Sequence, residues 1–316
     1  MQKNPLLVIT GPTASGKTDL AIQAALRLNG EIVSADSMQI YRYMDIGTAK
    51  PAIEERRGIP HHMIDIVNPD DKYNAALFQR QASKVIHSIS ERGKLPILVG
   101  GTGLYINSII YPMSFTDAME DQEYRWQLKK ILKKRGALYL HEFLLQVDPI
   151  TAGRLHPNDT RRIIRALEVY HLTGKTMEEY RQDFRRMEPT YNLMLYGLNP
   201  DRQKLYERIN ARAEKMLQSG LIQEVQNLLN MGYSKNLVSM QGLGYKEIVS
   251  YLRGLATLEE ATEILKRDTR RFAKRQLTWF RREERIGWLD PDAFVSPEAL
   301  CDWLITDVNK KLLYNW

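Results

Sequence analysis

The chain has 316 residues, of which 43% are hydrophobic and 26% charged, and this composition excludes a disordered chain. The single cysteine, Cys301, excludes a disulfide framework and a cysteine-based zinc cluster, as a reducing compartment permits. The sequence shows neither a signal-peptide core nor an apolar stretch long enough to cross a bilayer, so we expect a soluble cytoplasmic protein with no membrane partner.

The net charge of +7 is concentrated near the C-terminus. Nine Lys and Arg residues lie between Lys266 and Arg285 against three acidic residues, which gives this segment a net charge of +6. A basic segment of this kind indicates either a polyanionic partner or an ordinary solvated helix face.

The first hundred residues alternate short apolar runs with helical spacing. We predict strands at 6–9, 31–35, 62–66 and 96–99, and helices at 18–28 and 75–91. Strands that alternate with helices form parallel sheets through right-handed crossovers. The N-terminal region is therefore predicted to be an α/β sheet domain.

The pattern changes after Pro112. Residues 117–186 show only charged, helix-spaced sequence, whereas a strand pattern returns at 193–198 and is followed by mostly helical sequence, with a last helix from Ser296. We predict a core of residues 1–115 and 187–316, with helices on both faces of its sheet, interrupted by a helical insertion at 116–186.

One loop has the pattern of a phosphate-binding site. Gly11-Pro12-Thr13-Ala14-Ser15-Gly16-Lys17-Thr18 fits G-x-x-x-x-G-K-[ST] and lies between a predicted strand and helix. Inward-turned N–H groups and the helix N-terminus bind an anion, while Lys17 adds charge and Thr18 a hydroxyl for Mg²⁺. The fold class is thus a P-loop α/β sheet, and the ligand is either ATP or a diphosphate that is itself a leaving group.

Two strand ends are expected to face this loop, because ligands of open α/β sheets lie beyond the carboxyl ends of the strands. Asp36 follows the second strand, and Thr102 lies in a glycine turn after a later one. For Asp36 we consider a general base, an outer-sphere Mg²⁺ ligand, or the N-cap of the next helix. Thr102 either contacts substrate or only shapes the turn.

Eight segments resemble motifs of the bacterial tRNA dimethylallyltransferases, in the order of that family and over nearly the whole chain. They are GPTASGKT at 11–18, DSMQIY at 36–41, DIGTAKP at 45–51, PHH at 60–62, VGGTGL at 99–104, HPND at 156–159, ALEV at 166–169 and GLGYKE at 242–247. The tail after Asp290 matches no motif of the family.

The resemblance implies transfer of a dimethylallyl group from dimethylallyl diphosphate to N6 of adenosine 37, beside the anticodon of tRNA. Loop 11–18 would hold the diphosphate, and Mg²⁺, the implied cofactor, would neutralise charge on the leaving group. The exocyclic amine must lose a proton as it attacks, and Asp36 would accept that proton. Asp36 and Thr102 are then the catalytic residues, and we expect a monomer.

The resemblance also implies contacts with the anticodon stem-loop, from which the target base must be flipped into the site. The implied tRNA contacts are Asp36, Ser37, Met38, Gln39, Thr102, Tyr124, Thr160, Arg161, Arg162, Ile163, Ile164, Gly242, Leu243, Gly244, Tyr245, Lys246 and Glu247. Arg208 and Arg212, one turn apart on a predicted helix, are assigned to the diphosphate, with surface salt bridges as the alternative.

Several residues have a structural explanation of equal or greater weight. His61 and His62 suggest a metal pair, but adjacent strand residues point to opposite faces. Trp279, Phe280 and Trp288 are placed in the core rather than in base stacking. The rival functions are a small-molecule kinase that uses ATP at the same loop and an RNA-binding protein with a regulatory nucleotide switch.

Overall fold

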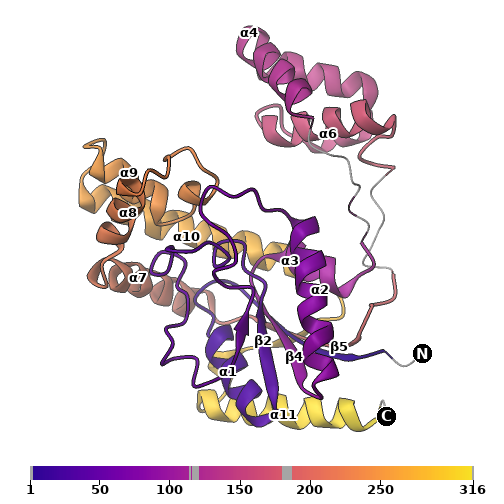
Figure 1. Cartoon of the computed structure of the whole chain (residues 1–316), viewed down its shortest axis with the longest axis vertical. Coiled ribbons are helices and arrows are strands. Elements are labelled where there is room, and N and C mark those ends of the chain that lie inside the picture. Colours follow the sequence, from indigo (N-terminus) through magenta and orange to yellow (C-terminus); the bar gives the residue numbers. More distant parts are fainter. Residues whose placement is uncertain (1–2, 114, 116–120, 180–186, 315–316) are drawn as a thin grey trace. The chain divides into compact units, whose positions relative to one another are not determined.

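Six parallel strands form one sheet in the order β3-β2-β4-β1-β5-β6, in a computed structural model that describes residues 3–113, 115, 121–179 and 187–314 (Figure 1). The strands are β1 (Pro5–Thr10), β2 (Gly30–Ser34), β3 (His61–His62), β4 (Leu95–Gly100), β5 (Asn192–Leu198) and β6 (Gly287–Leu289). The central strand β1 pairs Leu7 with Ile97 and with Met194. The predicted return of the chain to the sheet at 193–198 is therefore confirmed.

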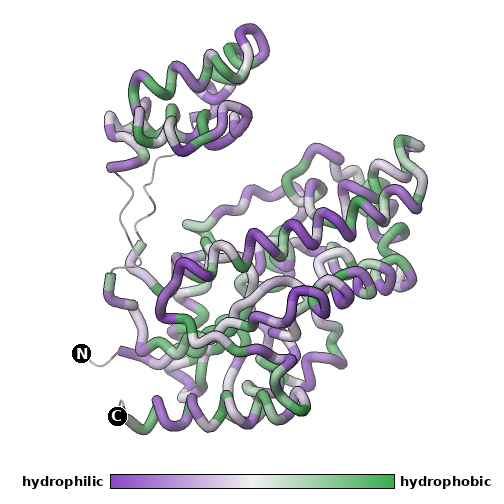
Figure 2. The backbone as a smooth tube through the Cα atoms, turned by 180° about the vertical axis from the view of Figure 1, so that it is seen from behind, coloured by the Kyte–Doolittle hydropathy of each residue, from purple (hydrophilic) through white to green (hydrophobic). Residues whose placement is uncertain are grey.

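Helices cover both faces of the sheet, because alternate residues of each buried strand point to opposite sides. Leu7 and Ile9 pack in one cluster with α1 (Lys17–Arg27) and α11 (Pro297–Tyr314). On the other face lie α2 (Ala75–Glu91) and α3 (Gly103–Ile110) (Figure 1). Along α11 hydrophobic and hydrophilic residues alternate (Figure 2), as a helix with one buried face requires.

A second layer of helices follows β5. It contains α7 (Arg202–Gln218), α8 (Leu221–Asn230), α9 (Tyr245–Leu252) and α10 (Leu258–Phe280). These helices enclose their own core, in which Leu221, Tyr245 and Ile248 are fully buried, and the loop after β2 adds Ile40 and Met44 to it. This shared core fixes the loop after β2 against the helices.

Two predictions of strand extent are wrong. The strand predicted at 62–66 has only His61 and His62 in the sheet, because Met63 and Asp65 take left-handed backbone conformations with φ of 64° and 56°. Met63 is buried in a loop instead, so its apolar character reflects the core and not a strand. At the other edge, β6 is a strand in a region that was predicted to be mostly helical.

The chain divides into two compact units, Met1–Pro112 with Glu188–Trp316, and Met113–Met187. The described residues of the second unit form α4 (Gln122–Val147), α5 (Pro149–Arg154) and α6 (Thr160–Thr173). Its core contains Leu128, Leu140, Leu144, Ile163 and Leu167. The helices of this unit thus have a hydrophobic core of their own.

Candidate active site

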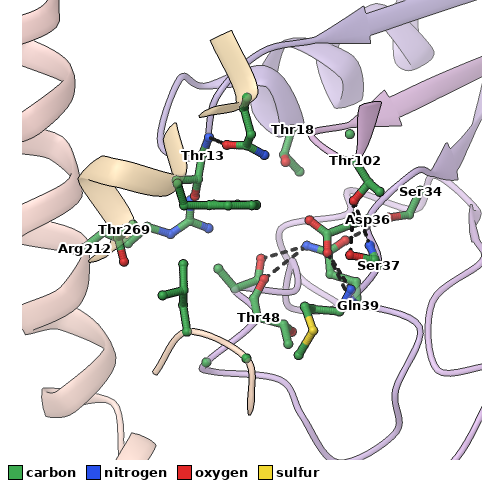
Figure 3. A pocket seen from close by; sticks show the side chains of 18 of the residues that line it. Thr13, Thr18, Ser34, Asp36, Ser37, Gln39, Thr48, Thr102, Arg212 and Thr269 are labelled. Atoms are coloured by element: carbon green, nitrogen blue, oxygen red, sulfur yellow. Dashed lines mark hydrogen bonds between the residues drawn. The ribbon is translucent and has the colours of Figure 1, made fainter. Parts of the chain in front are cut away.

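The carboxyl ends of β1, β2 and β4 open into a cavity of about 390 Å³ (Figure 3). The phosphate loop, the segment after β2 and the glycine turn after β4 form one side of it, and α7 and α10 form another. A cavity at this edge of a parallel sheet is where α/β proteins bind their ligands. Its size is suited to a small ligand or a single nucleobase.

The phosphate loop takes the conformation that the sequence predicts. Gly16 has a φ of 87° and begins α1, a left-handed conformation that favours glycine, and Ala14 has a φ of 62°. Thr13, Lys17 and Thr18 line the cavity. The Ser15 hydroxyl is buried without a hydrogen-bond partner among the described residues, so the loop retains an unsatisfied polar group next to its anion-binding N–H groups.

Two of the cations that line the cavity, Lys17 and Arg212, have lowered pKa values. Lys17 donates from Nζ to Pro12 O at 3.2 Å, and burial lowers its pKa to about 8, with the charge of Arg212 adding to the effect. Burial also lowers the pKa of Arg212, which approaches the cavity from the side opposite Asp36 (Figure 3). Within the described chain Arg212 has no carboxylate within ion-pair distance. A half-buried cation without a carboxylate partner is a site for an anionic ligand.

Asp36 is held by one carboxylate oxygen. Its Oδ1 accepts hydrogen bonds from Met38 N at 2.8 Å and Gln39 N at 3.3 Å, whereas Oδ2 has no hydrogen-bond partner in the described part of the chain. The segment that follows is a turn and not a helix, so Asp36 caps a turn, and the helix N-cap alternative is wrong. Oδ2 therefore stays free to accept a proton in the cavity.

Thr102 holds the segment after Asp36. Its Oγ1 accepts a hydrogen bond from Ser37 N at 3.0 Å and lies 3.3 Å from Ser37 Oγ. Gln39 extends this network, because its Nε2 donates to Thr48 O at 3.4 Å and Ala49 O at 3.3 Å (Figure 3). The predicted residues Asp36, Ser37, Gln39 and Thr102 are thus brought together at one wall of the cavity.

The chain is similar to known proteins of one family. The family model described as IPP transferase matches residues 39–283. A tRNA dimethylallyltransferase of Carboxydothermus hydrogenoformans is 55% identical over 302 residues, which cover 96% of each chain, and one of Pelotomaculum thermopropionicum is 56% identical over 95% of each.

Solved structures give the same result. A tRNA isopentenylpyrophosphate transferase of Bacillus halodurans has a TM-score of 0.75 at 44% identity, with 99% of this chain and 98% of the other covered. A eukaryotic dimethylallyltransferase acting on tRNA has a TM-score of 0.79 at 30% identity, with 96% and 80% covered. The chain belongs to the IPP transferase family.

The two arginines assigned to the diphosphate occupy different places in this IPP transferase. Arg212 lines the cavity, whereas Arg208 is exposed, pairs with Asp292, and is not among the described residues around the cavity. The alternative of a surface salt bridge therefore holds for Arg208. Arg275, on α10, also lines the cavity and was not assigned to it from the sequence.

The residues of the loop at 242–247 also occupy different places: some line the cavity and others are buried in the core. Gly242, Leu243 and Lys246 line the cavity. Tyr245 is fully buried and donates to Glu224 at 2.7 Å, and Glu247 is buried and accepts from Gly244 N at 2.9 Å. The side chains of Tyr245 and Glu247 therefore stabilise the loop, and their assignment to tRNA contact stays a prediction that their burial does not support.

The residues of the second unit assigned to tRNA also separate by burial. Thr160, Arg161 and Arg162 lie in the first turn of α6, with Arg161 and Arg162 exposed, but Ile163 and Ile164 are 0% and 8% exposed in the core. The side chains of Ile163 and Ile164 therefore belong to the core of this unit, and their burial does not support the predicted tRNA contact. Tyr124 is half-buried and stacks on His171, with ring centroids 3.9 Å apart.

The histidine pair follows its structural explanation. Of the three aromatic residues placed in the core, Trp279 is half-buried and Trp288 is 37% exposed, so the core prediction is wrong for Trp288. His62 lies 2.7 Å from Glu31, while Nδ1 of His61 lies 2.8 Å from Ile59 O. No group of three or more His, Cys, Asp or Glu residues in the described chain has the spacing of a metal site. Phe280 is buried in the core.

None of the described helices is long and apolar enough to cross a membrane.

Proposed function

We propose that this chain transfers the dimethylallyl group of dimethylallyl diphosphate to N6 of adenosine 37 in the anticodon loop of tRNA. The bond between C1 of the dimethylallyl group and the diphosphate oxygen breaks, and a bond between C1 and N6 forms. The observation that carries the proposal is one cavity that combines two anion-binding cations with a free carboxylate oxygen. Family membership supports the same reaction.

The phosphate loop and its cations act on the leaving group. The N–H groups at the start of α1, together with Lys17 and Arg212, bind the diphosphate and stabilise the negative charge that develops on it as it leaves C1. These groups are positioned before the substrate arrives, so they reorganise little during the reaction. The buried Ser15 hydroxyl is a further donor to a diphosphate oxygen.

Asp36 and Thr102 act on the nucleophile. The amine at N6 is a weak nucleophile because its lone pair is conjugated with the ring, and it becomes reactive when its proton is taken up as the new bond forms. Asp36 accepts that proton at Oδ2, while the hydrogen bonds to Oδ1 keep the carboxylate in one orientation. Thr102 keeps the segment 36–39 beside the cavity through Ser37.

The oxygen donors of the site fit Mg²⁺, which binds substrate phosphates together with few protein ligands. The Thr18 hydroxyl, which lines the cavity, would hold the ion together with diphosphate oxygens, and the ion would neutralise charge on the leaving group. We propose that the chain works as a monomer in the cytoplasm, where unmodified tRNA is available.

The deciding experiment incubates the protein with unmodified tRNA, Mg²⁺ and labelled dimethylallyl diphosphate. The expected result is label at N6 of adenosine 37 and release of diphosphate. A thermal-shift series with ATP, GTP and dimethylallyl diphosphate runs beside it, because a ligand stabilises the protein that binds it. Stabilisation by ATP or GTP alone, with no label in tRNA, would replace the transferase by a kinase or a nucleotide switch.

A further inference from the structure

One buried amide joins the two loops on either side of the anion-binding site. Gln276, on α10, is 6% exposed. Its Oε1 accepts a hydrogen bond from Thr13 N in the phosphate loop at 2.9 Å, which Figure 3 draws at Thr13, and its Nε2 donates to Gly101 O at 2.9 Å. The amide thus connects the loop after β1 with the turn after β4.

Filling space in the core does not explain why a glutamine occupies position 276 of α10. On α10 the buried neighbours at this spacing are Leu265, Ala273 and Phe280, so a glutamine places a polar group on an apolar face. Burying an amide is costly unless its hydrogen bonds are made, and here both ends of the amide are used. The absence of a side chain at Gly101 leaves space for the amide of Gln276, since a Cβ there would lie 2.1 Å from Gln276 Nε2.

The two loops that Gln276 joins carry different parts of the reaction. Thr13 belongs to the loop that holds the diphosphate, while Gly101 precedes Thr102, which binds Ser37 beside Asp36. We infer that Gln276 is a positioning residue that fixes the spacing between the diphosphate and the base Asp36. The inference rests on the proposed function, because the spacing matters only if C1 and N6 meet between these loops. A displacement of about 1 Å between reacting groups lowers a rate by on the order of 100-fold.

Three variants of the full chain and one control test this role. Gln276→Met keeps the length and removes the amide, Gln276→Asn keeps the amide but is one methylene too short to reach both loops, and Gly101→Ala displaces the amide without altering Gln276. Ser108→Ala is the control, because it removes a buried hydrogen bond to Tyr105 O at a residue that does not line the cavity. Each protein is measured for melting temperature, for affinity for inorganic pyrophosphate with Mg²⁺ and for tRNA, and for single-turnover transfer.

We expect all three variants to lose roughly 10- to 100-fold in transfer rate and about tenfold in pyrophosphate affinity, with tRNA affinity unchanged within about twofold. Ser108→Ala should match the wild type in transfer rate and in pyrophosphate affinity. A folded Gln276→Met with the wild-type rate and pyrophosphate affinity would overturn the inference, because filling space would then be enough. If Gln276→Met does not fold, a wild-type rate in Gly101→Ala overturns it instead. If the wild type transfers nothing, the proposed function fails. The pyrophosphate affinities of the variants then still show whether Gln276 positions the phosphate loop.

Discussion

At the scale of single residues, the two carboxylate oxygens of Asp36 have different surroundings. Oδ1 orders the turn at Met38 and Gln39, and Oδ2 remains available in the cavity. An asparagine can accept the same two hydrogen bonds through its own Oδ1, but its amide nitrogen takes up no proton at neutral pH. This residue therefore offers a test that separates catalysis from folding.

Asp36→Asn should fold with a nearly unchanged melting temperature and bind both substrates. Its rate of transfer should fall roughly 10²- to 10⁴-fold, the usual contribution of a general base. Single-turnover kinetics across a Mg²⁺ series measures this. A rate close to that of the wild type would end the base assignment, and partial rescue by added Mg²⁺ would assign Asp36 to the metal instead.

Lys17 makes diphosphate affinity depend on pH. Its pKa in the free protein is lowered to about 8, and a bound dianion favours the charged amine, so binding raises this pKa. Affinity for dimethylallyl diphosphate should therefore be constant below about pH 8 and fall toward tenfold per pH unit above it. Calorimetry from pH 7 to 9.5 measures the slope. Lys17→Met should bind weakly with no such fall, and a flat wild-type profile would contradict the pKa assignment.

Arg212 and Arg208 form a matched pair on α7. Arg212→Gln should weaken pyrophosphate binding by roughly 10- to 100-fold, the effect of losing a charge-assisted hydrogen bond. Arg208→Gln removes the exposed pair with Asp292 and should change the affinity by less than about twofold. Equal losses in the two variants would show that the diphosphate extends beyond the cavity described above.

The sequence predicts residues that act through their own chemical type better than residues that act through the fold. Gly11–Thr18 could be assigned because the motif requires those residue types at that spacing, and Asp36 because it follows a strand. Gln276 lies about 260 residues from its partner Thr13, and only its place on the apolar face of a helix marks it. The burial of Tyr245 and Ile163 could not be predicted, because a motif gives no information about burial.

At the scale of elements, the first turn of α6 presents the cations of the second unit unequally. Asp159 caps the helix and pairs with Arg162, which is 75% exposed in its side chain. Arg165 pairs instead with the fully buried Glu168. Arg162 is therefore the better candidate for a phosphate contact, and Arg165 supports the core of this unit.

Arg162→Ala should weaken tRNA binding and reduce the slope of log affinity against log salt concentration by about one unit, because one phosphate contact is lost. Filter binding over a range of salt concentrations measures the slope. Arg27→Ala removes an exposed arginine that pairs with Asp302 on the sheet unit, and it is expected to leave the slope unchanged. The same slope in Arg162→Ala as in the wild type would give Arg162 a purely structural role.

The error at 62–66 has a physical origin. A short apolar run is compatible with a strand or with a buried loop, and only the backbone conformation distinguishes the two. Residues 63–66 form a loop because Met63 and Asp65 take positive φ values, which their residue types do not predict. The helix at 75–91 was predicted with its observed limits because 17 residues of regular spacing leave little ambiguity.

At the scale of the whole molecule, the helical unit leaves and re-enters the sheet unit at one place. Thr190 N donates to Ile110 O at 2.8 Å, so the two segments of the sheet unit that flank the insertion are adjacent. Replacing residues 113–187 by a short glycine linker should give a folded core that binds pyrophosphate as the wild type does and has lost most of its tRNA affinity. Melting temperature, calorimetry and filter binding test this, and wild-type tRNA affinity in the shortened chain would remove the second unit from RNA recognition.

The same adjacency affects how the protein reaches its fold. The central strand β1 must pair with β5. This pairing closes a loop that contains all residues between Thr10 and Asn192. Helical units form through local contacts and fold quickly, so a folded insertion shortens that loop by about 75 residues before the strands meet. Loop-closure entropy changes by only about 0.6 kcal/mol for each doubling of length. An insertion flanked by two hydrogen-bonded segments of the sheet unit therefore adds little to the kinetic barrier of sheet formation.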